Sequence, residues 1–274
     1  MGRWLITLTA VAALVVVPAA LPGDASTRNV ARSFTIAGGA TKSVTVRCPR
    51  GWVAASGGVR SAGEGTTTLA IRPAGASAVN VRVANPRGNA SHRMAVAATC
   101  LGLRGGRSAP HYKAAHVRRR ISVAAGSQKQ AGLRCPSGML TAGAGFDVFG
   151  LPLQVRREGL ALNSFSFTVQ NDGTRARSAL LYGTCLTLVR PAGARRVRLN
   201  VRVLTVTTPL APGTRTVGEA CPRGWFGLAT GYTLPASVTL GGSVALPGGG
   251  RWSLTNDTTK PVLPDLQLAC ARIA

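Results

Sequence analysis

The stretch "CPRGWVAASGGV", residues 48–59, occurs three times in this chain with small changes. It returns as "CPSGMLTAGAGF" at residues 135–146 and as "CPRGWFGLATGY" at residues 221–232. Each copy begins with C-P-x-G. A further glycine lies ten positions after each of these cysteines: Gly58, Gly145 and Gly231. Such internal repetition is typical of a fold that is built from copies of one unit.

Two further landmarks follow each copy in the same order. The first is an asparagine in a turn-forming segment: Asn85, Asn171 and Asn256. The second is another cysteine: Cys100, Cys185 and Cys270. The two cysteines of a copy are 52, 50 and 49 positions apart. Because the landmarks drift so little, we interpret the chain as three copies of a unit of about 86 residues.

The amino-terminal segment predicts export. Arg3 precedes an almost wholly apolar run, Trp4–Val17, and Pro18 and small residues follow it. This order is typical of a secretion signal, which we place at residues 1–25. The alternative is an uncleaved membrane anchor, because the run is almost long enough to span a bilayer. We expect a secreted, extracellular protein with no membrane span in the mature chain.

The six cysteines of an exported chain favour disulfide bonds. The repeat predicts pairing within each copy: Cys48 with Cys100, Cys135 with Cys185, and Cys221 with Cys270. A bridge that closes a loop of this length contributes about 4 kcal/mol in the chain-entropy description. A zinc site is the competing interpretation, and the absence of C-x2-C spacing and of nearby histidines argues against it.

The composition predicts strands joined by tight turns. The chain has 34 Gly and 16 Pro, and apolar residues alternate before each asparagine, as at Val79, Val81 and Val83. Period-two alternation indicates strands with one buried face. The predicted fold is therefore all-β, with three tandem disulfide-stapled antiparallel β-sandwich repeats. We place them at residues 26–104, 105–190 and 191–274, and the alternative is one pseudo-threefold β-prism.

Each motif also has a local structural meaning. In C-P-x-G the proline fixes one backbone angle and the glycine frees another, which predicts a tight turn after the disulfide. The glycine at offset ten predicts a close approach by another strand or by the disulfide. Trp52 and Trp225 share one offset with Met139. We interpret them as core residues that pack against the disulfide rather than as exposed platforms for sugars.

The motifs resemble those of a group of secreted bacterial proteins, many of them actinobacterial, that carry C-P-x-G segments with a later Gly-Gly and a distant cysteine. The resemblance covers essentially residues 30–274, and only the first copy keeps the full Gly57-Gly58 pair. It implies an exported β-rich module without catalysis. The threefold C-P-x-G repetition is more distantly similar to the vitelline membrane outer layer proteins, which implies the β-prism as the alternative fold.

Few residues are suited to catalysis or to metal binding. The chain has 8 acidic residues and 3 histidines. No Ser-His-Asp arrangement and no phosphate-binding glycine loop is recognisable. His111 and His116 lie between the first two copies, where we expect an exposed linker. We therefore expect no enzyme activity, no cofactor and no metal site.

The remaining chemical feature is positive charge. The formal net charge is +25, and 29 of the 33 basic residues are arginines. A protein of this kind is attracted to polyanions in a salt-dependent way. The predicted binding residues are the local arginine clusters: Arg118, Arg119, Arg120, Arg156, Arg157, Arg195, Arg196 and Arg198.

Outside a cell, the expected partners are anionic cell-wall polymers or acidic polysaccharide. No motif for sequence-specific nucleic-acid recognition is present, so we expect none. The alternative to a polyanion-binding protein is a structural or matrix protein whose charge is incidental.

Overall fold

The computed structural model describes residues 25–61, 65–86, 90–103, 110–149, 152–190 and 198–274. In this part of the chain the regular structure is entirely β-strand. The expected secretion signal, residues 1–25, lies outside the described residues except for Ala25, with which the first strand begins.

Each copy supplies six strands. The first copy contains β1 (Ala25–Ile36), β2 (Thr41–Arg47), β3 (Val53–Ser61), β4 (Thr67–Pro73), β5 (Ala78–Ala84) and β6 (His92–Leu103). The second contains β7 (His111–Val123), β8 (Gln128–Arg134), β9 (Leu140–Val148), β10 (Leu153–Leu160), β11 (Ser164–Asn171) and β12 (Arg177–Val189). The third contains β13 (Leu199–Thr207), β14 (Gly213–Ala220), β15 (Phe226–Thr233), β16 (Val238–Leu246), β17 (Gly249–Asn256) and β18 (Asp265–Ile273).

All three copies form the same antiparallel sandwich. In the first, β1, β6 and β3 form one layer, and β2, β5 and β4 form the other. The equivalent strands of the other copies are paired in the same order. Each disulfide joins the two layers, because its first cysteine follows the second strand of the copy and its second cysteine lies in the sixth. The three bonds are Cys48–Cys100, Cys135–Cys185 and Cys221–Cys270, which confirms the predicted pairing.

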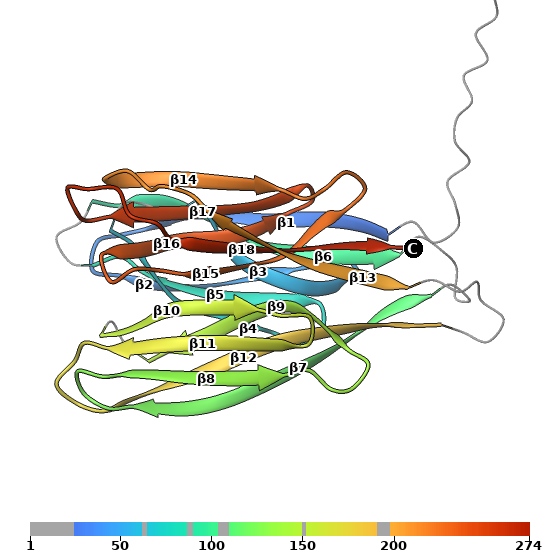
Figure 1. Cartoon of the computed structure of the whole chain (residues 1–274), viewed down its shortest axis with the longest axis horizontal. Helices are drawn as coiled ribbons and strands as arrows, with labels where there is room; N and C mark the ends of the chain where they lie inside the picture. Colours follow the sequence, from blue (N-terminus) through green and yellow to red (C-terminus); the bar gives the residue numbers. More distant parts are fainter. Residues whose placement is uncertain (1–24, 62–64, 87–89, 104–109, 150–151, 191–197) are drawn as a thin grey trace, which may run out of the picture.

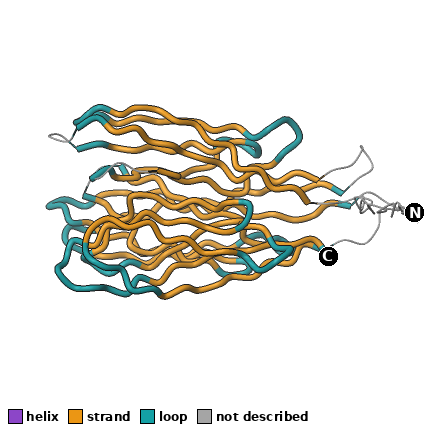
Figure 2. Tube along the Cα trace, turned by 90° about the horizontal axis from the view of Figure 1, so that it is seen from above, coloured by secondary structure: helices purple, strands orange, loops and turns teal. Residues whose placement is uncertain are grey.

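The sheets continue from one copy into the next. Strand β4 pairs with β9, and β10 pairs with β15, so that two six-stranded sheets each contain strands of two copies. Strand β16 of the third copy lies beside β3 of the first. The three sandwiches are thereby arranged around one axis, with their strands running along the long dimension of the molecule (Figures 1 and 2).

The glycine at offset ten is the residue that allows this arrangement. A side-chain carbon on Gly145 would overlap the carbonyl oxygen of Ile71 in β4, and one on Gly231 would overlap that of Glu158 in β10. On Gly58 it would overlap the carbonyl oxygen of Ser243 in β16. The predicted close approach by another strand is confirmed. The structure adds that this strand always belongs to a neighbouring copy.

The third strands of the copies, β3, β9 and β15, meet along the axis. The Oγ of Ser56 in β3 donates a hydrogen bond of 2.7 Å to the carbonyl of Leu228 in β15. Gly143 of β9 faces the backbone of Ala55, with no room for a side chain. The buried apolar side chains of all three copies form one continuous cluster. The predicted all-β fold of three disulfide-stapled antiparallel repeats is confirmed, and the repeats share one core in a prism-like arrangement.

The asparagine landmarks are buried hydrogen-bonding centres. The Nδ2 of Asn171 donates to the carbonyls of Val123, at 3.0 Å, and Arg175, at 2.9 Å. Its Oδ1 accepts a bond from the backbone N–H of Gly173, as expected of an asparagine that caps its own turn. Asn256 has the same pattern, with donation to Leu210. Asn171 thus connects its own turn to the end of β7, and Asn256 connects its turn to Leu210, three residues after β13.

The C-P-x-G segments turn as predicted. Gly51, Gly138 and Gly224 have φ angles of 82°, 74° and 78°, a region open mainly to glycine. Met139, which follows the turn of the second copy, is buried, whereas the two tryptophans are half-buried and pack against the core. Trp52 lies against Gly102, and the guanidinium of Arg272 lies 4.8 Å from the ring centroid of Trp225.

Candidate functional site

The predicted arginine clusters lie on different elements. Arg118, Arg119 and Arg120 are exposed on β7, and Arg157 is exposed on β10. Arg156 is half-buried on the same strand. Arg198 is exposed just before β13, whereas Arg195 and Arg196 lie outside the described residues.

The structure brings together one arginine from each of two clusters. Arg119 and Arg157 line a shallow groove of about 360 Å³ that lies over β8 and β11. Polar side chains complete much of its lining: Gln130, Ser166 and Thr168. Both arginines are among the predicted binding residues, but their positions in the chain give no sign that they share one groove.

The other arginines of these clusters are directed elsewhere. Arg118 and Arg120 lie on the face of β7 opposite to that of Arg119, because successive residues of a strand alternate. Arg156 uses its Nε to bond the Oε1 of Gln170, at 3.1 Å, and its Nη1 to bond the carbonyl of Val238, at 2.9 Å. Among the predicted residues that the structure describes, the groove is therefore lined by Arg119 and Arg157 alone.

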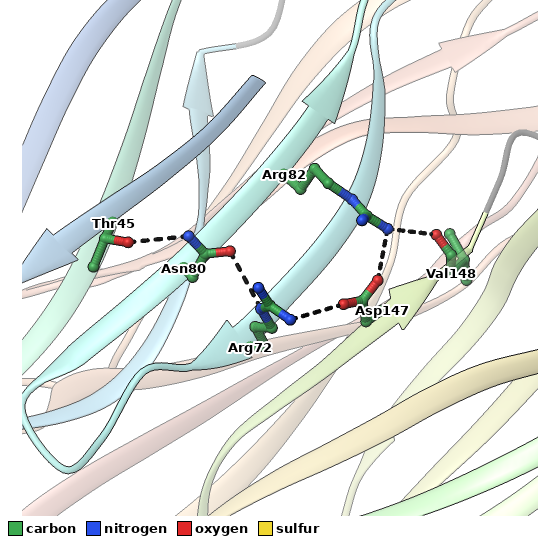
Figure 3. A network of polar contacts seen from close by, with 6 residues as sticks. All are labelled: Thr45, Arg72, Asn80, Arg82, Asp147 and Val148. Atoms are coloured by element: carbon green, nitrogen blue, oxygen red, sulfur yellow. Dashed lines mark hydrogen bonds and ion pairs between the residues drawn. The ribbon is translucent and has the colours of Figure 1, made fainter. Parts of the chain in front are cut away.

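A second basic cluster encloses a buried carboxylate where the first two copies meet (Figure 3). Asp147 of β9 is 1% exposed, and its two oxygens accept bonds from Arg82, at 2.7 Å, and from Arg72, at 3.2 Å. The same Arg82 nitrogen donates to the carbonyl of Val148, at 2.8 Å. The Nε of Arg72 donates to Asn80, at 3.3 Å. Sequence reasoning missed this site, because Asp147 lies far from both arginines in the chain.

Most of the positive charge has no carboxylate partner. Within the described residues, Arg72 and Arg82 are the basic side chains that form ion pairs, both with Asp147. The exposed arginines of β7 and β10 form none there. The positive charge of the described strands β7 and β10 is therefore displayed at the surface rather than neutralised by ion pairs.

A second carboxyl group is buried where the second and third copies meet. Glu158 is 3% exposed, and burial raises its pKa to about 8. It lies opposite Tyr232 of β15, whose pKa is also raised by burial and by the nearby glutamate. The equivalent pair between the first two copies is Ile71 and Phe146, which is apolar. The second junction thus contains a carboxyl group at a position where the fold also accepts a hydrocarbon side chain.

This burial predicts a pH-dependent stability. The folded chain keeps the Glu158 proton up to about pH 8, whereas the unfolded chain releases it near its ordinary value of 4.5. The stabilising contribution of the neutral form is complete below pH 4.5 and is lost as the pH rises towards 8. We expect the free energy of unfolding to fall by on the order of 1 kcal/mol per pH unit in this window, measured by urea denaturation.

A variant without the Glu158 carboxyl group separates its effect on the pH dependence of stability from that of the histidines. Burial lowers the pKa of His116, which works in the opposite direction over part of the same range. The difference between the wild type and Glu158→Gln removes that contribution, and Glu158→Ile copies the first junction. Both variants should lose the decline between pH 5 and 8. An unchanged pH profile in Glu158→Gln would contradict the assignment.

His111 and His116 are exposed as expected, but the expectation that they lie in a linker is wrong. His111 and His116 both belong to the 13-residue strand β7, which pairs with β12 along its whole length. They are five positions apart, so their side chains lie on opposite faces of the strand. The His116 Nδ1 lies 3.3 Å from the Oγ1 of Thr184.

The described part of the chain contains neither a candidate metal-binding cluster nor a candidate membrane-spanning helix. No three His, Cys, Asp or Glu side chains in it are grouped closely enough to hold a metal ion. Within the same residues, no helix has the length and the apolar character that a membrane crossing requires.

Comparison with known proteins adds little. No protein-family profile and no curated protein sequence matches the chain. Among solved structures, one described as "The Triple Jelly Roll Fold and Turret Assembly in an Archaeal Virus" aligns with 92% of this chain and 90% of its own. The identity is 8% and the TM-score is 0.21, a likeness that carries no argument about fold or function.

Proposed function

We propose that this is a non-catalytic extracellular protein that binds anionic polymers of the cell envelope or its surroundings through its basic surface. The observation that carries the proposal is the unpaired charge: the chain has 33 basic and 8 acidic residues, and the exposed arginines of β7 and β10 have no carboxylate partner among the described residues. Unpaired surface cations attract polyanions over a long range.

Two other features support the proposal, one for the extracellular setting and one for polymer binding. Three disulfides are typical of proteins in oxidising compartments. The basic surface is also carried by a rigid scaffold, because the arginines of β7 and β10 extend from paired strands of six-stranded sheets rather than from loops. The backbone that carries these cations therefore needs no ordering when a polymer binds.

Retention on purified wall polymer tests the proposal. The protein should remain bound at an ionic strength of about 0.15 M, where charges farther apart than about 8 Å are largely screened. Elution should require higher salt, with the logarithm of the binding constant falling linearly with that of the salt concentration. The triple variant Arg118→Gln, Arg119→Gln and Arg120→Gln should elute at lower salt than the wild type.

The control is the same polymer after its anionic groups have been neutralised chemically, which should not retain the protein. A structural protein with incidental charge would bind a strong cation-exchange resin and yet leave the wall polymer before 0.15 M salt is reached. That result would overturn the proposed function.

A further inference from the structure

The repeat allows the same surface to be compared in two copies. In the first copy, Ser43, Arg82, Ala70 and Asp147 lie side by side across β2, β5, β4 and β9. In the second copy, the equivalent row across β8, β11, β10 and β15 is Gln130, Thr168, Arg157 and Thr233. The adjacent row is Thr45, Asn80 and Arg72 in the first copy, and Gly132, Ser166 and Gly159 in the second.

In the first copy this surface already holds a carboxylate. Arg72 and Arg82 approach the two oxygens of Asp147 from different strands. Asn80 orients Arg72 and is itself held by the Oγ1 of Thr45, at 3.0 Å. The fold therefore shows, within its own chain, how this face binds a carboxylate group with arginines and neutral polar side chains.

In the second copy the same surface has no carboxylate and is hollow. Thr233 stands where the first copy has Asp147, and Gly132 and Gly159 stand where it has Thr45 and Arg72. The groove of about 360 Å³ opens beside this row, where Gly132 and the polar side chains of Gln130, Ser166 and Thr168 line it. Arg157 projects from β10, which pairs with β11, and Arg119 comes from β7, which lies beside β8. Neither arginine has an ion-pair partner among the residues that the structure describes.

We propose that this groove binds the carboxylate of an acidic sugar unit between two arginines from different strands, as two arginines from different strands hold Asp147 at the first junction. Arg119 and Arg157 contact the carboxylate, and the hydroxyls of Ser166 and Thr168 and the amide of Gln130 bond the sugar hydroxyls. Two arginines suit this role because guanidinium groups form strong, directional hydrogen bonds with carboxylates. The inference rests on the proposed function and assigns it one site and one ligand class, an acidic polysaccharide.

A defined oligomer of galacturonate is the probe, and its binding is measured by calorimetry at about 0.15 M salt. The double variant Arg119→Gln, Arg157→Gln should weaken binding at least tenfold. The matched control is Arg202→Gln, Arg215→Gln, which removes the same charge from exposed positions on β13 and β14 of the third copy. It should change binding less than threefold. Equal losses in the two double variants would reduce the effect to net charge and overturn the site.

A second pair of variants fills the groove from within. Thr168→Asp places a carboxylate opposite Arg157, whereas Thr168→Asn has nearly the same shape and no charge. Binding of the oligogalacturonate should be at least tenfold weaker in the Asp variant than in the Asn variant. Equal binding by the two would contradict the proposal. Circular dichroism spectra and melting temperatures show whether both variants are folded.

Two other ligands test whether the groove prefers a sugar carboxylate to other chemical groups. A neutral oligomer of galactose should not bind, and polyglycerol phosphate should bind more weakly than oligogalacturonate and without loss in the Arg119, Arg157 variant. Preferential binding of the phosphate polymer in the groove would overturn the assignment to a sugar carboxylate. Binding of oligogalacturonate that is unaffected by the groove variants would overturn this site, and retention of the wild type on wall polymer would leave the proposed function standing. Absence of retention by the wild type would overturn the proposed function itself.

Discussion

Replacing Gly58 with alanine should destabilise the protein by at least about 3 kcal/mol. The added methyl group would overlap the carbonyl oxygen of Ser243 in β16. Gly242, the residue before Ser243, already packs against Val59. A backbone carbonyl within a paired strand cannot rotate away as a flexible side chain can. Room for the methyl requires β3 and β16 to separate, which opens the contact between the first and third copies. Denaturant unfolding followed by circular dichroism measures the loss.

Gly248 supplies the matched control. A side-chain carbon built there has no heavy atom within 4 Å, and its backbone does not adopt the left-handed region. Gly248→Ala should therefore change stability by less than about 0.5 kcal/mol. A Gly58→Ala protein as stable as Gly248→Ala would show that the first and third copies are not in contact at this point.

Reduction of the disulfides should have an effect at least as large. Each bond closes a loop, with cysteine separations of 52, 50 and 49 residues, and joins the two layers of its sandwich. Loss of one bond should cost about 4 kcal/mol by the loop-closure relation, so loss of all three should unfold a domain of ordinary stability. The double variant Cys135→Ala, Cys185→Ala measures one bond by denaturant unfolding.

The order of reduction is also predictable. Cys221 is half-buried, whereas the other five cysteines are no more than 9% exposed. The Cys221–Cys270 bond should therefore be reduced first under mild conditions, which peptide mapping of partly reduced protein detects. A protein that keeps its melting temperature after complete reduction would contradict the structural role of the bonds.

The architecture within each copy could be predicted from the sequence, because it depends on spacing. The cysteine pairs, the C-P-x-G turns and the turns at Asn171 and Asn256 recur at nearly fixed offsets, and each interaction lies within one copy. The glycine at offset ten predicted a close approach for a local reason, namely that a missing side chain leaves space.

The contacts between copies could not be predicted in the same way. Nothing in the sequence around Gly145 indicates that the approaching strand is β4 of the preceding copy. The equivalent positions of the other copies hold Arg60 and Thr233, so the repeat pattern gave Asp147 no role, and its arginine partners come from the first copy. Arg119 and Arg157 belong to separate clusters that meet only because β7 and β10 flank β8 and β11.

The buried glutamate shows a related limit. At the second junction Glu158 faces Tyr232, whereas the equivalent residues of the first junction, Ile71 and Phe146, are both apolar. A sequence window around Glu158 reads as a polar, exposed strand, with two arginines before it. Only the pairing of β10 with β15 shows that this side chain is buried, and the pH profile follows from that burial.

The central claim is that the three copies close around one axis, and a nuclear Overhauser effect tests it most directly. A side-chain carbon at Gly242 would lie 2.7 Å from the Cβ of Val59, so the α-protons of Gly242 and the methyl protons of Val59 lie close together. The account predicts a strong cross-peak between these residues of the third and first copies. Absence of that cross-peak, in a spectrum that shows the contact of Trp52 with Gly102 within the first copy, would contradict closure.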